Sequence, residues 1–177
     1  SGSNPHNKIS PRMSSLIISR HVKDGLDMSV QYKLFRAVRQ FIQQHQGTDL
    51  IQYFYHQALN SGEQVLEGDY RYPGPLPHEK EVVIVSLADA CEAACRTLEK
   101  PTASKIEALV NEIFRKRWRD GQLDNANLTV EELSQINESF ARTLTTMYHS
   151  RIAYPKDENS DEDNVLFPER PAPGTES

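Results

Sequence analysis

The spacing of apolar residues predicts a helix over residues 11–32. Ser10 and Pro11 mark its start, because a serine oxygen can cap free backbone N–H groups and a proline at the first helical position loses no hydrogen bond. The apolar positions recur every three or four residues, at Met13, Ile17 and Met28. His21 falls on the same stripe. The pattern therefore predicts that His21 points inward.

The same period predicts a second helix over residues 34–46. Its apolar stripe is formed by Leu34, Val38, Phe41 and Ile42. His45 follows one turn later on that stripe, and Gly47 is typical of a helix end. We expect His45 to point inward as well. Thr48 is a candidate cap for a third helix, rich in aromatic residues, that ends after Leu59.

A nearly continuous apolar segment over residues 79–98 predicts a central buried helix. It follows a loop over residues 71–77, in which three prolines preclude a regular helix. The β-branched run over residues 82–85 is compatible with a strand, but the alanine-rich continuation and the lack of a partner strand favour a helix. Asp89 lies in the middle of this segment.

Two further helices complete the expected fold. The fifth runs from near Pro101 to Gly121, and its last turns are basic, as the helix dipole favours. Thr129 and Glu132 form a capping box that opens the sixth helix, with Leu128 and Leu133 as the flanking hydrophobic pair. The sequence thus predicts an all-α bundle of about six helices in one domain over residues 1–154. The acidic, proline-rich residues 155–177 are expected to be a disordered tail.

Charge and cysteine content narrow the possible functions. Seven of the 25 acidic residues, but only two of the 20 basic ones, lie from Pro155 onward, so the preceding 154 residues carry 18 of each sign. A neutral domain has no general field to gather nucleic acid, and we expect no DNA or RNA partner. No apolar run approaches the roughly 20 residues that cross a bilayer. Cys91 and Cys95 lie one helical turn apart, as reduced core residues of a cytoplasmic protein would.

His21, His45 and Asp89 are the residues most difficult to explain as core. A buried carboxylate costs several kcal/mol (about 3 or more) unless a cation, a metal ion or hydrogen bonds compensate it. Each histidine taken alone is more simply a satisfied core residue, and Asp89 alone is more simply paired with an arginine or lysine. Arg96 lies two turns beyond Asp89 on roughly the same face.

Eight short blocks, in order over about residues 4–155, resemble the cytoplasmic domain of bacterial seven-transmembrane receptor HD hydrolases. Each block alone is a weak signal, but eight at compatible spacing are specific. In sequence letters the blocks are NPHNKISP, LIISRHVKDG, QHQGT, YFYH, RYPGP, SLADACEAACRTL, DGQLD and RIAYP.

The resemblance implies an HD-domain-like metal phosphohydrolase that converts cyclic di-AMP to pApA with two divalent transition-metal ions, iron or manganese, that activate a water. It implies that His21, His45 and Asp89 are metal ligands, because imidazole and carboxylate groups suit such ions. The candidates for contacts with substrate phosphate are Lys23, Arg71 and Arg96, each of which is as readily explained by a solvated or salt-bridged role. The parent is expected to be membrane-anchored with this domain on the cytoplasmic side, and an oligomer is possible.

Two departures from the family pattern bear on activity. The family's first histidine and its defining His-Asp pair lie upstream of the NPHNKISP block, and no His-Asp dipeptide occurs in the chain, so its metal site is expected to be incomplete. Gln46 stands where relatives often have a second consecutive histidine. A fragment of an active receptor hydrolase explains the missing pair, and we favour it because the sequence opens inside a family-like block without an initiating methionine. The alternative is a degenerate or truncated HD domain that serves as a non-catalytic nucleotide-binding or interaction module.

Overall fold

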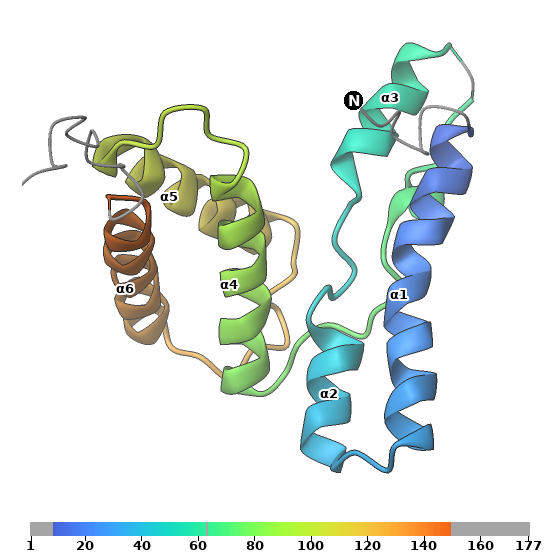
Figure 1. The fold of residues 1–177 in the computed structure, drawn as a ribbon, viewed down its shortest axis with the longest axis horizontal. Helices are drawn as coiled ribbons and strands as arrows, with labels where there is room; N and C mark the ends of the chain where they lie inside the picture. Colours follow the sequence, from blue (N-terminus) through green and yellow to red (C-terminus); the bar gives the residue numbers. More distant parts are fainter. Residues whose placement is uncertain (1–8, 63, 150–177) are drawn as a thin grey trace, which may run out of the picture.

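The computed structural model describes residues 9–62 and 64–149, and this part of the chain contains six α-helices, one short 3-10 helix and no strand (Figure 1). The first group of helices comprises α1 (Pro11–Gln31), α2 (Arg36–Gln44), α3 (Gln52–Asn60) and the 3-10 helix η2 (Glu67–Tyr70). The second comprises α4 (Lys80–Cys95), α5 (Ala103–Arg119) and α6 (Val130–His149). The predicted all-α fold is confirmed, whereas the predicted tail and its boundary lie outside the described residues.

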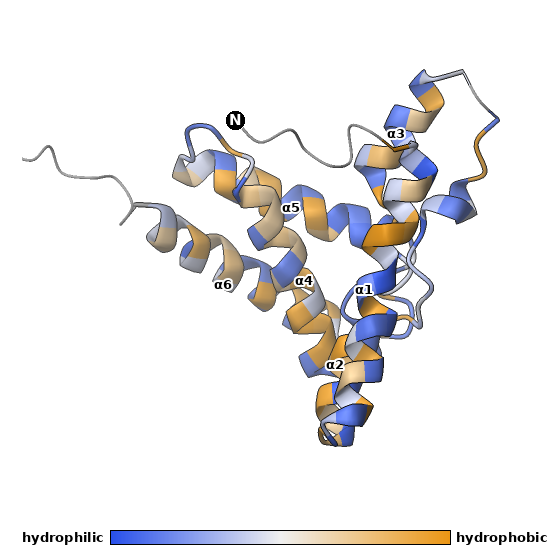
Figure 2. Cartoon of the chain, turned by 45° about the vertical axis from the view of Figure 1, so that its right-hand side comes forward, coloured by the Kyte–Doolittle hydropathy of each residue, from blue (hydrophilic) through white to orange (hydrophobic). Residues whose placement is uncertain are grey.

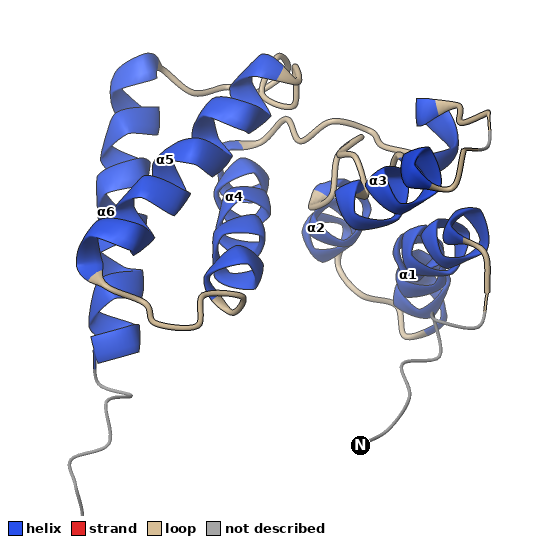
Figure 3. Ribbon diagram, turned by 90° about the horizontal axis from the view of Figure 1, so that it is seen from above, coloured by secondary structure: helices blue, strands red, loops and turns tan. Residues whose placement is uncertain are grey.

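The two groups lie side by side, and the proline-rich segment after η2 leads from one to the other (Figure 3). Each has its own small core. In the first group the core is formed by Phe54, Ala58 and Tyr70. In the second it is larger and includes Val83, Leu87, Cys91, Ile106, Val110, Phe114 and Leu144. α2 and α4 are in contact where the two groups meet, which we call the junction.

Side-chain caps are present at three helix starts, and two of them, at α1 and α6, are predicted from the sequence. The side chain of Ser10 accepts a hydrogen bond from the backbone N–H of Met13. At α6 the capping box is complete, because the N–H of Thr129 donates to Glu132 Oε2 at 2.8 Å and the N–H of Glu132 donates to Thr129 Oγ1 at 3.1 Å. Thr102 caps α5. These helix boundaries follow from local chemistry.

The orientation predicted for α1 is wrong. Its buried face is lined by Ser14, Ser15, Val22 and Ser29. Most of the larger apolar residues of α1 face outward instead: Met13, Leu16, Ile17, Met28 and Val30 are exposed. Met28 is 57% exposed, and Phe35, at the start of α2, is 84% exposed. Figure 2 shows apolar stretches, in orange, along α1 and α2.

Two local predictions also need correction. Thr48 does not cap α3, which begins at Gln52 after Ile51, because Thr48 is engaged by Gln122 from the second group. α4 is buried on one side only, so Asp89 lies on an exposed face with Val85 and not in a buried helix. None of the described helices is both long enough and apolar enough to span a membrane.

Candidate functional site

The rings of His21 and His45 meet where α1 passes the end of α2. Their Nε2 atoms are 3.3 Å apart, and the ring centroids are 5.4 Å apart. The other nitrogen of each ring is fixed by the backbone. His21 Nδ1 lies 2.6 Å from the carbonyl oxygen of Ile18, and His45 Nδ1 lies 2.9 Å from that of Ile42. Because a carbonyl oxygen can only accept, each Nδ1 carries a hydrogen and donates it.

This arrangement leaves the Nε2 atoms of His21 and His45 facing each other as the remaining ring positions. Two lone pairs that face each other at 3.3 Å repel unless a proton or a cation lies between them. Two nitrogens bound about 2.0–2.1 Å from one metal ion at a tetrahedral angle would lie about 3.3–3.4 Å apart. The observed separation therefore fits a shared metal ion. Anchoring of the remote nitrogen by a carbonyl is also typical of metal-binding histidines.

Asp89 is hydrogen-bonded to Gln46, the residue after His45. Gln46 Nε2 donates a hydrogen bond of 3.1 Å to Asp89 Oδ2. Within residues 9–62 and 64–149, however, no three histidine, cysteine, aspartate or glutamate side chains are grouped closely enough to hold a metal ion. The structure thus places His21 and His45 together and links Asp89 to Gln46, the residue after His45.

Tyr72 borders the histidine pair and was not singled out from the sequence. Its ring packs edge-to-face on His21, with the centroids 5.8 Å apart. Its backbone N–H donates to the carbonyl oxygen of Asp49, which fixes the segment after η2 beside the turn after α2. Burial, with a further contribution from Asp49 and Asp89, raises the pKa of Tyr72 to about 12. At neutral pH the phenol is therefore a hydrogen-bond donor beside the pair.

A buried ion pair joins the two helix groups close to Tyr72. Arg117 of α5 contacts Asp49 with Nη2 and Oδ2 at 3.2 Å, and both side chains are largely inaccessible to solvent. In the sequence alone Arg117 is one member of a basic cluster at the end of α5, which the helix dipole favours. The pairing of Arg117 with Asp49 has no local signal, because 68 positions separate the two residues, counting from 49 to 117.

Arg71 lies at the same junction, but its guanidinium is already engaged. It forms a bidentate ion pair with Asp120 at 2.7 and 2.9 Å, and also binds Glu67 and the carbonyl oxygen of Thr48. The hydrogen bond to Arg71 lowers the pKa of Asp120, and that to Asp120 raises the pKa of Arg71. These contacts give Arg71 a structural role, so a contact with phosphate would require it to leave Asp120.

The other two predicted phosphate contacts are exposed. Lys23 lies two residues beyond His21 on α1, with its side chain in solvent. Arg96, at the end of α4, forms an ion pair with Glu92, which raises the pKa of Arg96. Lys23, Arg71 and Arg96 share no contact within the described residues, and their role in binding stays a prediction.

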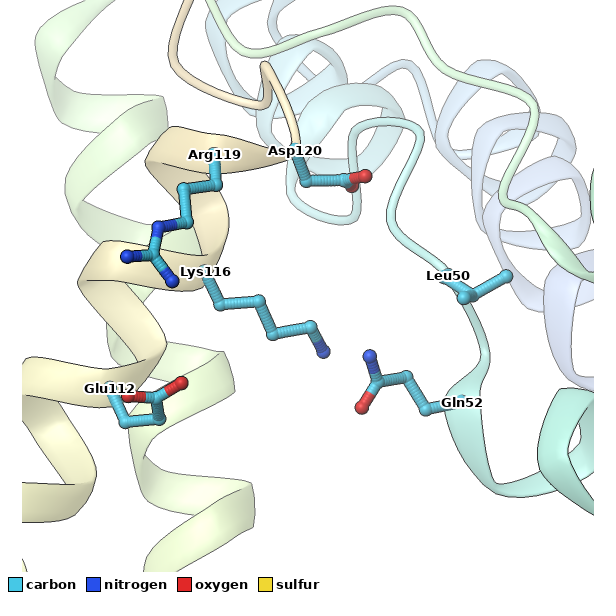
Figure 4. A pocket seen from close by; sticks show the side chains of 6 residues that line it. All are labelled: Leu50, Gln52, Glu112, Lys116, Arg119 and Asp120. Atoms are coloured by element: carbon cyan, nitrogen blue, oxygen red, sulfur yellow. The ribbon is translucent and has the colours of Figure 1, made fainter.

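A separate hollow of about 260 Å³ lies between the end of α5 and the start of α3 (Figure 4). Lys116 points across it toward Gln52, and burial lowers the pKa of Lys116. Two acidic residues, Glu112 and Asp120, balance the two cations of its lining, Lys116 and Arg119. The hollow contains neither histidine of the pair, so it is not the site that the sequence predicts.

Comparison with known proteins identifies relatives along most of the chain. The cyclic-di-AMP phosphodiesterase PgpH of Bacillus subtilis is 42% identical over 153 residues, which are 86% of this chain and 22% of that protein. PgpH of Listeria monocytogenes is 37% identical over 158 residues, 89% of this chain and 22% of that protein. An uncharacterized protein of Synechocystis is 46% identical over 161 residues, 88% of this chain and 20% of that protein. The chain thus spans about a fifth of the length of these curated relatives.

Solved structures match the fold as well as the sequence. The crystal structure of the L. monocytogenes PgpH HD domain has a TM-score of 0.78 at 36% identity, and the match covers 84% of this chain and 70% of that one. The same domain in complex with cyclic di-AMP gives a TM-score of 0.80 at 36% identity, over 84% and 69% of the two chains. No protein-family model matches. On the crystal structures and the curated relatives together, the chain belongs to the family of the PgpH HD domain.

Proposed function

We propose that this chain forms part of the catalytic domain of a metal-dependent phosphodiesterase that hydrolyses cyclic di-AMP to pApA. The observation that carries the proposal is the pair of Nε2 atoms of His21 and His45, 3.3 Å apart, with both Nδ1 atoms anchored on carbonyl oxygens. Two relatives named as cyclic-di-AMP phosphodiesterases and a related domain in complex with cyclic di-AMP support the choice of substrate.

In this proposal His21, His45 and Asp89 hold divalent transition-metal ions, iron or manganese, and two ions are expected. Imidazole and carboxylate ligands suit these ions. When bound, such ions would supply positive charge against the phosphate and lower the pKa of a water that attacks it. The carbonyl oxygens of Ile18 and Ile42 would keep the two imidazoles in the tautomer that can bind a metal.

The chain would contribute to substrate binding through basic side chains that contact the phosphates. Lys23 and Arg96 remain our proposed phosphate contacts, because an exposed ammonium group and an exposed guanidinium in a surface pair with Glu92 can turn to a ligand at little cost. Arg71 would have to break its bidentate pair with Asp120, which makes it the weakest of the three candidates. We also propose that the domain works in the cytoplasm, since Cys91 and Cys95 are buried free thiols.

The test is metal binding by the chain, followed by its effect on the nucleotide. We expect Mn²⁺ to bind in calorimetry, and His21→Ala and His45→Ala to abolish binding because each removes one Nε2. His78→Ala removes an exposed histidine that pairs with Glu79 and should leave binding unchanged. Turnover of cyclic di-AMP is then followed by chromatography of pApA with Mn²⁺ and with chelator. Absence of both metal binding and turnover would refute the proposal.

A second candidate is a non-catalytic module that binds the nucleotide without metal. The observation that favours it is the hydrogen bond from Gln46 to Asp89, which occupies a carboxylate that the enzyme would need for metal. This module predicts that cyclic di-AMP binds in calorimetry with the same affinity in the presence of chelator and in His21→Ala. Loss of nucleotide affinity on removal of metal would exclude it.

A further inference from the structure

Gln46 lies between the histidine pair and Asp89. It follows His45 directly, at the end of α2, whereas Asp89 belongs to α4 in the other helix group. Its side-chain amide crosses from one group to the other and donates to Asp89 Oδ2 at 3.1 Å. The histidines belong to α1 and the end of α2, so Asp89 is the candidate ligand that must come from across the junction (Figure 1).

The chemistry of the amide group determines what this contact can do. The nitrogen of a glutamine side chain carries two hydrogens and has no lone pair to offer, so it can compensate a carboxylate but cannot bind a cation. A hydrogen bond to a charged acceptor is also stronger than one between neutral groups. The amide of Gln46 therefore engages Asp89 Oδ2, one of the two carboxylate oxygens that could bind a metal ion.

The exposure of Asp89 agrees with a competition between the Gln46 amide and a metal ion for its carboxylate. In the described part of the chain no third acidic, histidine or cysteine side chain joins His21 and His45 in a metal-binding group. Asp89 is exposed, so the backbone and core of α4 do not lock its carboxylate in place. Gln46 supplies the side-chain hydrogen bond that holds it.

We propose that Gln46 is a positioning residue that restrains Asp89 and thereby lowers the affinity of the histidine pair for divalent metal ions. The inference rests on the proposed metal site. An opposite role is chemically reasonable, since a hydrogen bond that orients a metal-binding carboxylate usually raises affinity, and its loss then costs about 10- to 100-fold. The two roles predict changes of opposite sign.

The deciding variant is Gln46→Met, which keeps the length of the side chain and removes the donor. Mn²⁺ should bind about 10- to 100-fold more tightly, because a hydrogen bond to a charged acceptor no longer competes with the ion. Gln46→Glu should bind more tightly still, because it adds a carboxylate whose repulsion of Asp89 is relieved by a cation. The matched control is Gln44→Met, which removes another glutamine contact at the end of α2, from the N–H of His78 to Gln44 Oε1 at 3.2 Å. Its Mn²⁺ affinity should equal that of the wild type.

Calorimetry with Mn²⁺ and the visible absorption of bound Co²⁺ provide the readouts on the 177-residue chain. In chelator, Gln46→Met and the wild type should have the same melting temperature, since Asp89 is exposed. A gain in Mn²⁺ affinity would then not be explained by a gain in fold stability. An Mn²⁺ affinity of Gln46→Met equal to or weaker than that of the wild type would overturn the inference. If His21→Ala also binds as the wild type does, or if none of these proteins binds metal, the proposed site fails too. Binding that appears only in the Gln46 variants would support the inference.

Discussion

Replacing Arg117 by methionine tests whether the buried ion pair holds the two helix groups together. The side chain of Arg117 is 6% exposed and that of Asp49 is 18% exposed, and they meet at 3.2 Å. Breaking a buried pair by removing one partner typically costs about 3–5 kcal/mol, because the other charge is left without compensation. Asp49 keeps some access to water, and one oxygen of its carboxylate is buried without a partner already, so we expect about 3 kcal/mol.

The assay is urea unfolding followed by circular dichroism, with thermal unfolding as a second measurement. A loss of about 3 kcal/mol should lower the melting temperature by about 6–12 °C in a chain of this size. Asp49→Asn should destabilise to a similar extent because it leaves the guanidinium unpaired. In the double variant the two losses should fall short of additivity by about 1–3 kcal/mol.

The matched control for Arg117→Met is Arg115→Met, two residues away on the same helix. Arg115 forms an exposed pair with Glu112, and its loss should change the free energy of unfolding by less than about 0.5 kcal/mol. A cost below about 1 kcal/mol for Arg117→Met, or strict additivity in the double variant, would refute the argument that this pair is energetically coupled at the junction.

Three further predictions concern stability. Thr129→Ala removes the α6 cap and should cost about 1 kcal/mol in urea unfolding; no change would show that the capping box is dispensable. Arg71 lowers the pKa of Asp120 below its unfolded value of 3.8, so the stability from this pair is present above about pH 4 and is lost as pH falls through the folded pKa. The stability difference between wild type and Asp120→Asn should therefore narrow on acidification, and a constant difference would contradict the pairing. Gly47 has φ +54° and a Cβ there would lie 2.5 Å from Gln122 Oε1, so Gly47→Ala should lower the melting temperature, whereas an unchanged value would rule out this clash.

The sequence predicted well those parts of the fold that local chemistry determines. The capping box at Thr129 and Glu132 is read from four consecutive residues, and the structure has both of its hydrogen bonds. The apolar period of residues 11–32 likewise predicted α1 to within one residue. Such signals depend on neighbours along the chain, so they need no knowledge of the tertiary structure.

The same period did not show which face of α1 is buried. A stripe of large apolar residues indicates a face that can pack, but burial also depends on which neighbour approaches and how closely. In α1 the small side chains of Ser14 and Ser29 form the packed face, and Met28 faces outward. The expectation that His21 points into a core was therefore wrong. His21 instead meets His45 and Tyr72 near the surface.

The candidate site depends on contacts that no local pattern could reveal. His21 and His45 belong to one helix group and Asp89 to the other, so their relation depends on how the groups are joined. Three polar contacts join the two helix groups: Asp49 with Arg117, Arg71 with Asp120, and Thr48 with Gln122. Each links residues at least 49 positions apart. Because polar contacts are directional, they fix the junction more narrowly than apolar packing would. A change at this junction can therefore displace Asp89 from the histidine pair while all three candidate ligands remain in the sequence.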